Sequence, residues 1–262
     1  MANTNSLDLE HDSSQCAYIS DASQTGLDVS GDMTIECWVK LESLPASANV
    51  YAFVSKYASG AVSYLFNMYN TGAVYLMAVA WSSDGSTASN PYVIFTPETG
   101  VWHHFAATID VSAHLGEFFI DGTSVGSLVD GSQSSIFNSA TDFIIGGFNS
   151  GASPLGTFDG LIDEVKVWNV VRTQPQIAAD MESSSITANC VGYWKLNNDY
   201  LDETTNNNDL TAVNSPVFSS DVPFADYTIT TNIKAVSGVT YANMAKVSSV
   251  AKASIGKISG LA

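Results

Sequence analysis

Positively charged residues are scarce in this chain. Nine of its 262 residues are lysine or arginine and 26 are aspartate or glutamate, so the formal net charge is -17 at pH 7. Nucleic-acid binding depends on neutralising phosphates with lysine and arginine, so we expect no nucleic-acid partner for the body of the chain. We also expect no transmembrane segment, because no apolar run approaches the roughly 18 residues of a spanning helix.

Cysteine is also rare, with only Cys16, Cys37 and Cys190 present. An odd number of cysteines without metal-type spacing argues against a complete disulfide framework. We expect reduced packing residues, with a Cys16–Cys190 bridge as the alternative. The opening residues MANTNSLDLEHDSS contain neither a basic nor an apolar stretch, so no secretory leader is expected unless one was removed before the numbering began.

Short segments of alternating apolar and polar residues fill residues 1–224. In MTIECWVKL, one strand face would carry a row of core side chains: Met33, Ile35, Cys37, Val39 and Leu41. Clusters of Gly, Asn, Asp and Ser separate such segments, which predicts antiparallel strands joined by turns. Asp121-Gly122 lies between two apolar segments and is typical of a type I′ hairpin turn. The pattern therefore predicts an all-β sandwich or barrel.

One short helix is expected near residues 173–181. Thr173 is a suitable N-cap, Pro175 fits the first turn, and Ile177 and Met181 lie one above the other at i and i+4. We expect this helix to pack on a sheet edge.

Three stretches resemble successive signatures of one family. They are SLDLEHDSSQCAYISDASQTGLDVSGDMTIECWVKLES, GVWHHFAATIDVSAHLGEFFIDGTSVG and IGGFNSGASPLGTFDGLIDEVKVWNVVRTQPQIAADM. They are similar to laminin-G-like domains of the concanavalin A-like lectin and glucanase superfamily, as is CVGYWKLNNDYLDETTNNNDLTAVNSP, which we expect to return and pair near the amino-terminal strand. The resemblance covers roughly residues 5–224 and implies an antiparallel jelly-roll β-sandwich. It leaves function open, because this fold supports sugar binding, adhesion and hydrolysis.

Residues 225–262 differ from the sandwich in charge and in period. All 26 acidic residues precede residue 228, whereas four of the nine lysines and arginines follow it. Three copies of an eleven-residue unit align these apolar residues: Ile233, Val236, Val239, Met244, Val247, Val250, Ile255, Ile258 and Leu261. An eleven-residue period supports a right-handed helical supercoil, and Ser-Gly turns between short strands support a β solenoid or prism.

Three such short units bury too little surface to be stable alone. We therefore expect residues 225–262 to be an assembly tail, which forms a homo-oligomer such as a trimer or docks on a capsid or tail scaffold. A poorly ordered tail is the alternative.

A lectin-like sandwich joined to a short repeated tail resembles surface proteins of tailed viruses. This combination favours a non-catalytic decoration protein of the virion surface, which presents the sandwich for binding surface glycans or for adhesion. A glucanase-like glycoside hydrolase and a secreted bacterial adhesin at the cell surface are the alternatives.

No catalytic residue is predicted. Retaining glycosidases need two carboxyl groups about 5 Å apart. Asp8, Glu10 and Asp12 alternate along one strand face, but they do not follow the Glu, Asp, Glu order of the superfamily's glucanases. Strand alternation places the members of two adjacent pairs on opposite faces: Asp163 with Glu164, and His103 with His104.

Calcium is implied by the resemblance, because many laminin-G-like and pentraxin-like modules hold Ca²⁺ at a rim with carboxylates and backbone carbonyls. A calcium ion takes six to eight oxygen ligands. Acid-bearing loops surround Asp21 and Asp28, Asp84, Asp110, and residues 199–209. None of them matches a linear calcium motif, and the ligands stay unassigned.

The loop AWSSDGSTASNPY is a candidate carbohydrate site. Trp81 and Tyr92 flank it, and Asp84 and Asn90 lie between them. Sugar sites commonly pair an aromatic platform with polar side chains, and loops on a rigid sandwich often carry recognition. The alternative is a hairpin loop whose aromatic side chains complete the core.

Overall fold

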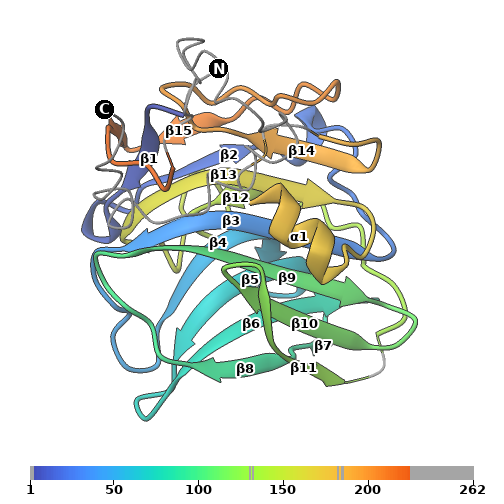
Figure 1. Cartoon of the computed structure of the whole chain (residues 1–262). Helices are drawn as coiled ribbons and strands as arrows, with labels where there is room; N and C mark the ends of the chain where they lie inside the picture. The colour runs from blue at the N-terminus through green and yellow to red at the C-terminus, as the bar shows by residue number, and fades with distance from the viewer. Residues whose placement is uncertain (1–2, 130, 132, 182, 184–185, 225–262) are drawn as a thin grey trace, which may run out of the picture. The chain divides into compact units, whose positions relative to one another are not determined.

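The computed structural model describes residues 3–224, except residues 130, 132, 182 and 184–185. Within these residues, two eight-stranded antiparallel sheets pack face to face (Figure 1). Sheet A has the order β11 (Thr123–Val129), β10 (Leu115–Ile120), β9 (Trp102–Asp110), β3 (Met33–Leu41), β13 (Gly160–Trp168), β1 (Ser6–Leu9) and β16 (Val217–Ser219), and β14 (Cys190–Trp194) also pairs with β13. Sheet B has the order β15 (Thr211–Val213), β2 (Cys16–Ile19), β12 (Phe143–Ile145), β4 (Val50–Ala58), β5 (Ala61–Asn70), β6 (Tyr75–Ser82) and β7 (Ala88–Ser89), and β8 (Tyr92–Phe95) also pairs with β6.

The core lies between the two sheets and follows the alternation of the strands. In β3, the predicted core row belongs to the main buried cluster: Met33, Ile35, Cys37, Val39 and Leu41. Aromatic rings from both sheets fill the centre, where Phe53 lies 5.2 Å from Phe66 and 5.5 Å from Phe105 between ring centroids. Each buried side chain of this size contributes about 1.5–3 kcal/mol. The sandwich predicted from sequence is confirmed.

The hairpin turn between β10 and β11 has the predicted form. Asp121 has φ 50° and Gly122 has φ 71°, as a type I′ turn requires. The Asp121 carboxylate also accepts a hydrogen bond from the His104 backbone N–H at 2.9 Å, which joins the turn to β9.

Helix α1 (Gln174–Asp180) begins as predicted, after Thr173 and with Pro175 in its first turn. The Gln176 side chain accepts a hydrogen bond from the Thr173 backbone N–H at 2.8 Å. Ile177 is fully buried and packs against Ala106 of β9 and Phe119 of β10. The helix therefore packs on the outer face of sheet A and also contacts β11, the edge strand of that sheet, so its predicted position at a sheet edge is confirmed in part.

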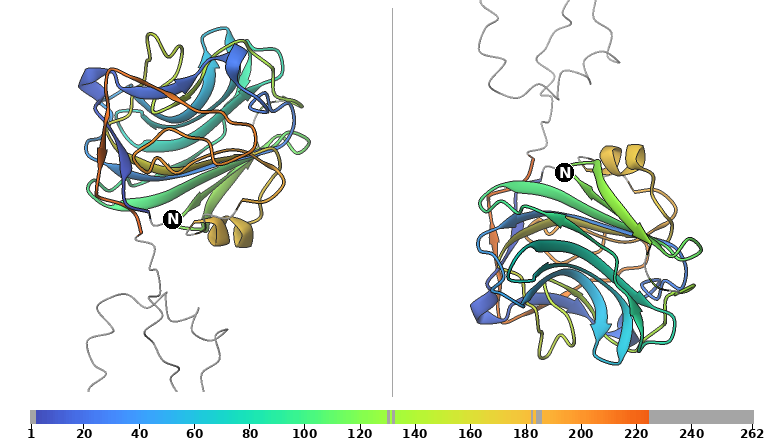
Figure 2. Two further views of the ribbon diagram at one scale, coloured as in Figure 1. Left: turned by 90° about the horizontal axis from the view of Figure 1, so that it is seen from above. Right: turned by 90° about the horizontal axis from the view of Figure 1, so that it is seen from below.

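The last strands complete the sandwich beside the first ones. β15 pairs with β2 and β16 pairs with β1, as expected for the segment after the helix. The CVGYW strand itself, β14, pairs with β13 instead of the amino-terminal strand. Figure 2 shows these late segments crossing the same side of the sandwich as β1 and β2. Two one-turn 3-10 helices follow the first two strands, at His11–Ser13 and Asp21–Ser23.

All three cysteines are free, so the alternative Cys16–Cys190 bridge is absent. Burial raises the pKa of the Cys16 and Cys190 thiols to about 12. No helix among the described residues is long and apolar enough to cross a membrane. The predicted assembly tail, 225–262, lies outside the described residues, and its domain boundary and apolar repeat stay predictions.

Candidate functional site

A groove of about 340 Å³ opens where β2 meets β15. Tyr18 of β2 lies on the outer face of sheet B, because its neighbours Ala17 and Ile19 belong to the core. Thr211 of β15 is the register partner of Tyr18, so the phenol ring and the hydroxyl stand side by side. The complete lining is Tyr18, Ile19, Ser20, Ser23, Asn207, Asp209 and Thr211.

The far wall of the groove is a loop held in place by one carboxylate. Asp202 accepts hydrogen bonds from the backbone N–H groups of Tyr193 at 3.0 Å, Thr204 at 2.9 Å and Asn208 at 2.9 Å. Asp209 in turn accepts one from the Asp202 backbone N–H at 3.0 Å. These bonds fix the loop before any ligand arrives, which reduces the entropy cost of binding.

Gly151 touches the aromatic side chain of the groove. A Cβ atom at this position would lie 2.2–2.5 Å from atoms of the Tyr18 ring, so only glycine fits there. The Gly151 backbone N–H donates a hydrogen bond to the Asp142 carboxylate at 2.9 Å, which anchors this contact. The position of the Tyr18 ring is therefore set by the loop between β12 and β13, which carries Gly151.

The chemical groups of the groove are an aromatic ring, hydroxyls, an amide and a carboxylate. Asn207, Asp209 and Thr211 are exposed to solvent. Such a set offers a stacking surface together with hydrogen-bond donors and acceptors, which is the requirement for binding the hydroxyls and the apolar face of a sugar.

The predicted loop site is not assembled as expected. Trp81 is 0% exposed, and its Nε1 donates a hydrogen bond to the Gln133 carbonyl at 3.2 Å. Its predicted role as a sugar-stacking platform was wrong, because the ring completes the core. Tyr92 is 43% exposed, on β8, and Asn90 is exposed beside it.

The Asp84 side chain stabilises the turn of that loop. Its Oδ1 accepts hydrogen bonds from the backbone N–H groups of Thr87 and Ser86, each at 2.8 Å, and from the Ser82 hydroxyl at 2.9 Å. These bonds, the Thr87 bond first, lower the pKa of Asp84. Its carboxylate therefore stabilises the local fold.

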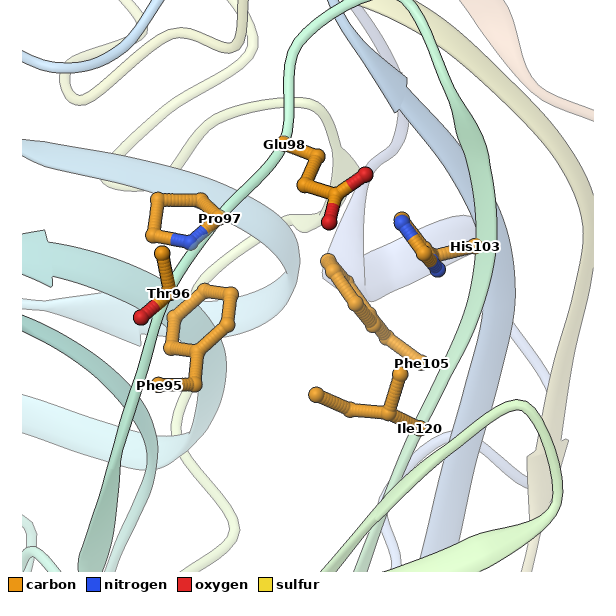
Figure 3. A pocket seen from close by; sticks show the side chains of 7 residues that line it. All are labelled: Phe95, Thr96, Pro97, Glu98, His103, Phe105 and Ile120. Atoms are coloured by element: carbon orange, nitrogen blue, oxygen red, sulfur yellow. The ribbon is translucent and has the colours of Figure 1, made fainter.

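A second opening, of about 60 Å³, lies between β8 and β9 and is lined by Phe95, Thr96, Pro97, Glu98, His103, Phe105 and Ile120 (Figure 3). Figure 3 shows the Glu98 and His103 side chains facing each other across it. His103 Nδ1 lies 2.9 Å from Asp121 Oδ2, and the His103 ring stacks parallel on Phe105. This volume holds a few water molecules and is too small for a sugar ring.

An acidic cluster forms where β1 and β3 end. Oxygen atoms of Asp8, Glu10 and Glu42 lie within 4.8 Å of one another. Burial raises the pKa of each of the three carboxyl groups, and repulsion from neighbouring carboxylates, including Asp159, raises it further. The sequence placed Asp8, Glu10 and Asp12 on one strand face. In the structure Asp8 and Glu10 lie close together, but Asp12 lies in a 3-10 helix. Glu42 is the third member of the cluster.

The donor set of this acidic cluster fits a calcium ion. Asp8 Oδ1 is buried and makes no hydrogen bond to any described residue. Lys40, the nearby cation, forms its ion pair with Asp221. Three carboxylates with one orphaned oxygen would supply several of the oxygen ligands that Ca²⁺ requires, and the ion would neutralise their mutual repulsion.

The two pairs of adjacent residues, one of histidines and one of acids, were both expected to face opposite sides of a strand, and the structure arranges them differently. His104 is 1% exposed and lies 3.5 Å from Glu36, whereas His103 lines the small opening, so this pair does face opposite ways. The expected alternation of Asp163 and Glu164 was wrong. A β-bulge interrupts β13 there, with Glu164 at φ 51°, and both carboxylates are buried.

These features define a lectin-like antiparallel β-sandwich with a polar groove on the outer face of one sheet. Residues 12–178 match the family model of the concanavalin A-like lectin/glucanases superfamily, and the chain belongs to this superfamily. No curated protein matches the chain significantly.

Two solved structures share this fold at low sequence identity. A candidate carbohydrate-binding protein of Bacteroides ovatus is 16% identical, with a TM-score of 0.62, and the match covers 82% of this chain and 59% of that one. The native heptameric SAP-like pentraxin of Limulus polyphemus is 13% identical, with a TM-score of 0.54, and the match covers 78% of this chain and 87% of that one. The chain thus spans little more than half of the Bacteroides structure.

Proposed function

We propose that the sandwich is a non-catalytic module that binds glycans in the Tyr18 groove. The observation that carries this proposal is the pairing of Tyr18 with exposed hydroxyl, amide and carboxylate groups in a preformed groove of about 340 Å³. The shared fold of a candidate carbohydrate-binding protein supports it. Hydrolysis remains the alternative, because the carboxylate oxygens of the acidic cluster lie within 4.8 Å, near the separation of about 5 Å used by retaining glycosidases.

Replacing Gly151 by alanine should weaken glycan binding at least about tenfold, a loss of about 1.4 kcal/mol. The added Cβ must displace the Tyr18 ring, while every polar group of the groove is retained. Binding would be measured on arrays of bacterial and algal oligosaccharides and then by calorimetry with the glycan retained.

Gly31→Ala is the matched control, because a Cβ there meets no atom within 4 Å. Unchanged binding by Gly151→Ala would refute the groove assignment, and an absence of binding by the wild-type protein would refute glycan binding. Release of reducing ends from any bound glycan would show that the module is a hydrolase.

We further propose that Asp8, Glu10 and Glu42 hold a calcium ion. Saturating Ca²⁺ should raise the melting temperature, since a ligand bound only by the folded protein adds about 2.7 kcal/mol at one hundred times its dissociation constant. Differential scanning calorimetry with and without EDTA would measure the shift, and Glu42→Gln should abolish it. An equal shift in the Gln variant would show that calcium binds elsewhere.

The proposed setting is the surface of a virion, with the repeats of residues 225–262 as the anchor or oligomerisation device. The opposite charge of the two parts and the eleven-residue apolar period support this proposal. A chain ending at Phe224 should bind glycans like the full chain but sediment as a monomer and stay out of particles. Assembly by the shortened chain would refute the anchoring role, and recovery only from a cell-surface fraction would favour an adhesin.

A further inference from the structure

The described part of the sandwich has no free lysine or arginine to offer an acidic ligand. Five lysines and arginines precede residue 228, against all 26 acidic residues. Four of the five form an ion pair with an aspartate or glutamate, and they are Lys40, Lys56, Arg172 and Lys195. The fifth, Lys166, is 1% exposed and donates hydrogen bonds to backbone carbonyls. A sulfated or uronic-acid glycan would therefore meet uncompensated repulsion at this surface.

The Tyr18 groove contains a carboxylate without a counter-ion. Of the described residues that line it, Asp209 is the only aspartate or glutamate, and none is a lysine, arginine or histidine. Asp209 is exposed to solvent and forms no ion pair with any residue that the structure describes. Its Oδ1 accepts a hydrogen bond from the Asp202 backbone N–H at 3.0 Å, so the loop holds the side chain in place before a ligand arrives.

A second carboxylate lies on the other side of Tyr18. Tyr18 has one register partner on β12 and one on β15, and Asp142 and Asp209 each come two residues before one of these partners. The Asp142 carboxylate accepts a hydrogen bond from the Gly151 backbone N–H at 2.9 Å, and Gly151 packs against the Tyr18 ring. Each neighbouring strand lies about 4.8 Å from β2, within the Debye length of about 8 Å at physiological salt, so both charges act on a ligand over Tyr18.

We propose that the Tyr18 groove selects glycans that carry free amino groups, such as glucosamine units, over acidic glycans. This selectivity rests on the proposed glycan-binding function and names the substrate class of the same groove. The ammonium group of the sugar pairs with the Asp209 carboxylate, and the apolar face of the sugar stacks on Tyr18. Asp142 adds to the attraction from the other side of the ring. An N-acetylated sugar carries no charge and forms no such pair.

Calorimetric titration of the full chain with three hexasaccharides tests this selectivity. They are β-1,4-linked glucosamine, its fully N-acetylated form and an oligogalacturonate. The wild type should bind the amine-bearing hexamer about fivefold more tightly than the acetylated one, as expected for an exposed charge pair, and the acidic one most weakly. Raising the salt concentration to about 1 M should remove the preference, because salt screens exposed charges.

Asp209→Asn should reduce the ratio of the amine-bearing to the acetylated affinity about fivefold, to near unity. Asparagine keeps a side-chain oxygen that can accept from the Asp202 backbone N–H, so the variant removes the charge and retains the bond that orders the loop. The control is Glu98→Gln, which removes one charge at an exposed position beside the small opening between β8 and β9 and should keep the wild-type ratio.

The outcomes separate this selectivity from glycan binding itself. If the amine-bearing hexamer binds no more tightly than the acetylated or the acidic one, the selectivity is overturned, while binding of any arrayed glycan keeps the proposed function. An unchanged ratio in Asp209→Asn also overturns the selectivity, because the preference would then not depend on that carboxylate. A wild-type protein that binds none of the hexamers and no arrayed glycan overturns both.

Discussion

Lys56→Met is expected to lower the free energy of unfolding by about 3 kcal/mol. The Lys56 side chain is 0% exposed, and its Nζ lies 2.6 Å from Asp21 Oδ1 and 3.0 Å from Asp28 Oδ1. The ammonium also donates to the Ser139 carbonyl. Methionine keeps most of the volume but removes the charge, so two carboxylates are left without their cation and the segments carrying Asp21, Asp28 and Ser139 lose their common anchor.

Urea unfolding followed by circular dichroism would measure this loss. Lys195→Met is the matched control, because Lys195 forms a more exposed pair with Glu203 at 2.9 Å and such pairs contribute under about 1 kcal/mol. Equal effects of the two substitutions would show that burial of Lys56 adds nothing to its ion pairs.

Asp163→Asn is expected to raise the free energy of unfolding by about 2 kcal/mol at pH 7, since a carboxylate kept charged at this depth costs several kcal/mol. Asp163 is 0% exposed, and burial raises its pKa well above 3.8, with repulsion from Glu164 as a further cause. Asn3 Nδ2 donates to Asp163 at 2.8 Å, and Asn3 Oδ1 has no described partner. A half-turn of the Asn3 amide would let that oxygen accept from a protonated Asp163 or from the new asparagine.

The sign of the pH dependence follows from the raised pKa. The contribution of Asp163 to stability is complete below its unfolded pKa of 3.8 and is lost as pH rises through its folded pKa. The advantage of Asp163→Asn over the wild type should therefore grow with pH across that window, in melts recorded from pH 3 to 8.

Asp110 provides the opposite case. Hydrogen bonds, first from the Ala113 backbone N–H and then from the Ser112 hydroxyl, lower its pKa. The advantage of the wild type over Asp110→Asn should therefore be complete above the unfolded pKa of Asp110 and should be lost as pH falls through the lowered folded pKa. For Asp163→Asn, a constant difference from the wild type across this pH range would show that the pKa of Asp163 is not raised on folding.

Local patterns in the sequence predicted local structure well. The alternation of β3, the Asp121-Gly122 turn and the start of α1 each depend on residues that are close in the chain, and all three are confirmed. The alternation rule failed at Asp163 and Glu164, because a bulge adds a residue to β13 and no local signal marks it.

Such local patterns could not predict the groove. Tyr18 and Thr211 are register partners although nearly the whole sandwich separates them in the chain, so only the topology brings them together. Glu42 joins Asp8 and Glu10 for the same reason, because β1 and β3 end on the two sides of β13. Trp81 misled the prediction because an aromatic residue beside a polar loop has the same pattern whether its ring faces the core or the solvent.

The pairing of β2 with β15 and of β1 with β16 affects folding during synthesis. β2 ends at Ile19 and its partner β15 begins at Thr211, so a ribosome working at about 5–20 residues per second separates them by roughly 10–40 s. Throughout that interval the open edge of β2 is available to other nascent chains. Completion of the sandwich therefore waits for its last strands, and binding of a chaperone during translation would favour the correct pairing.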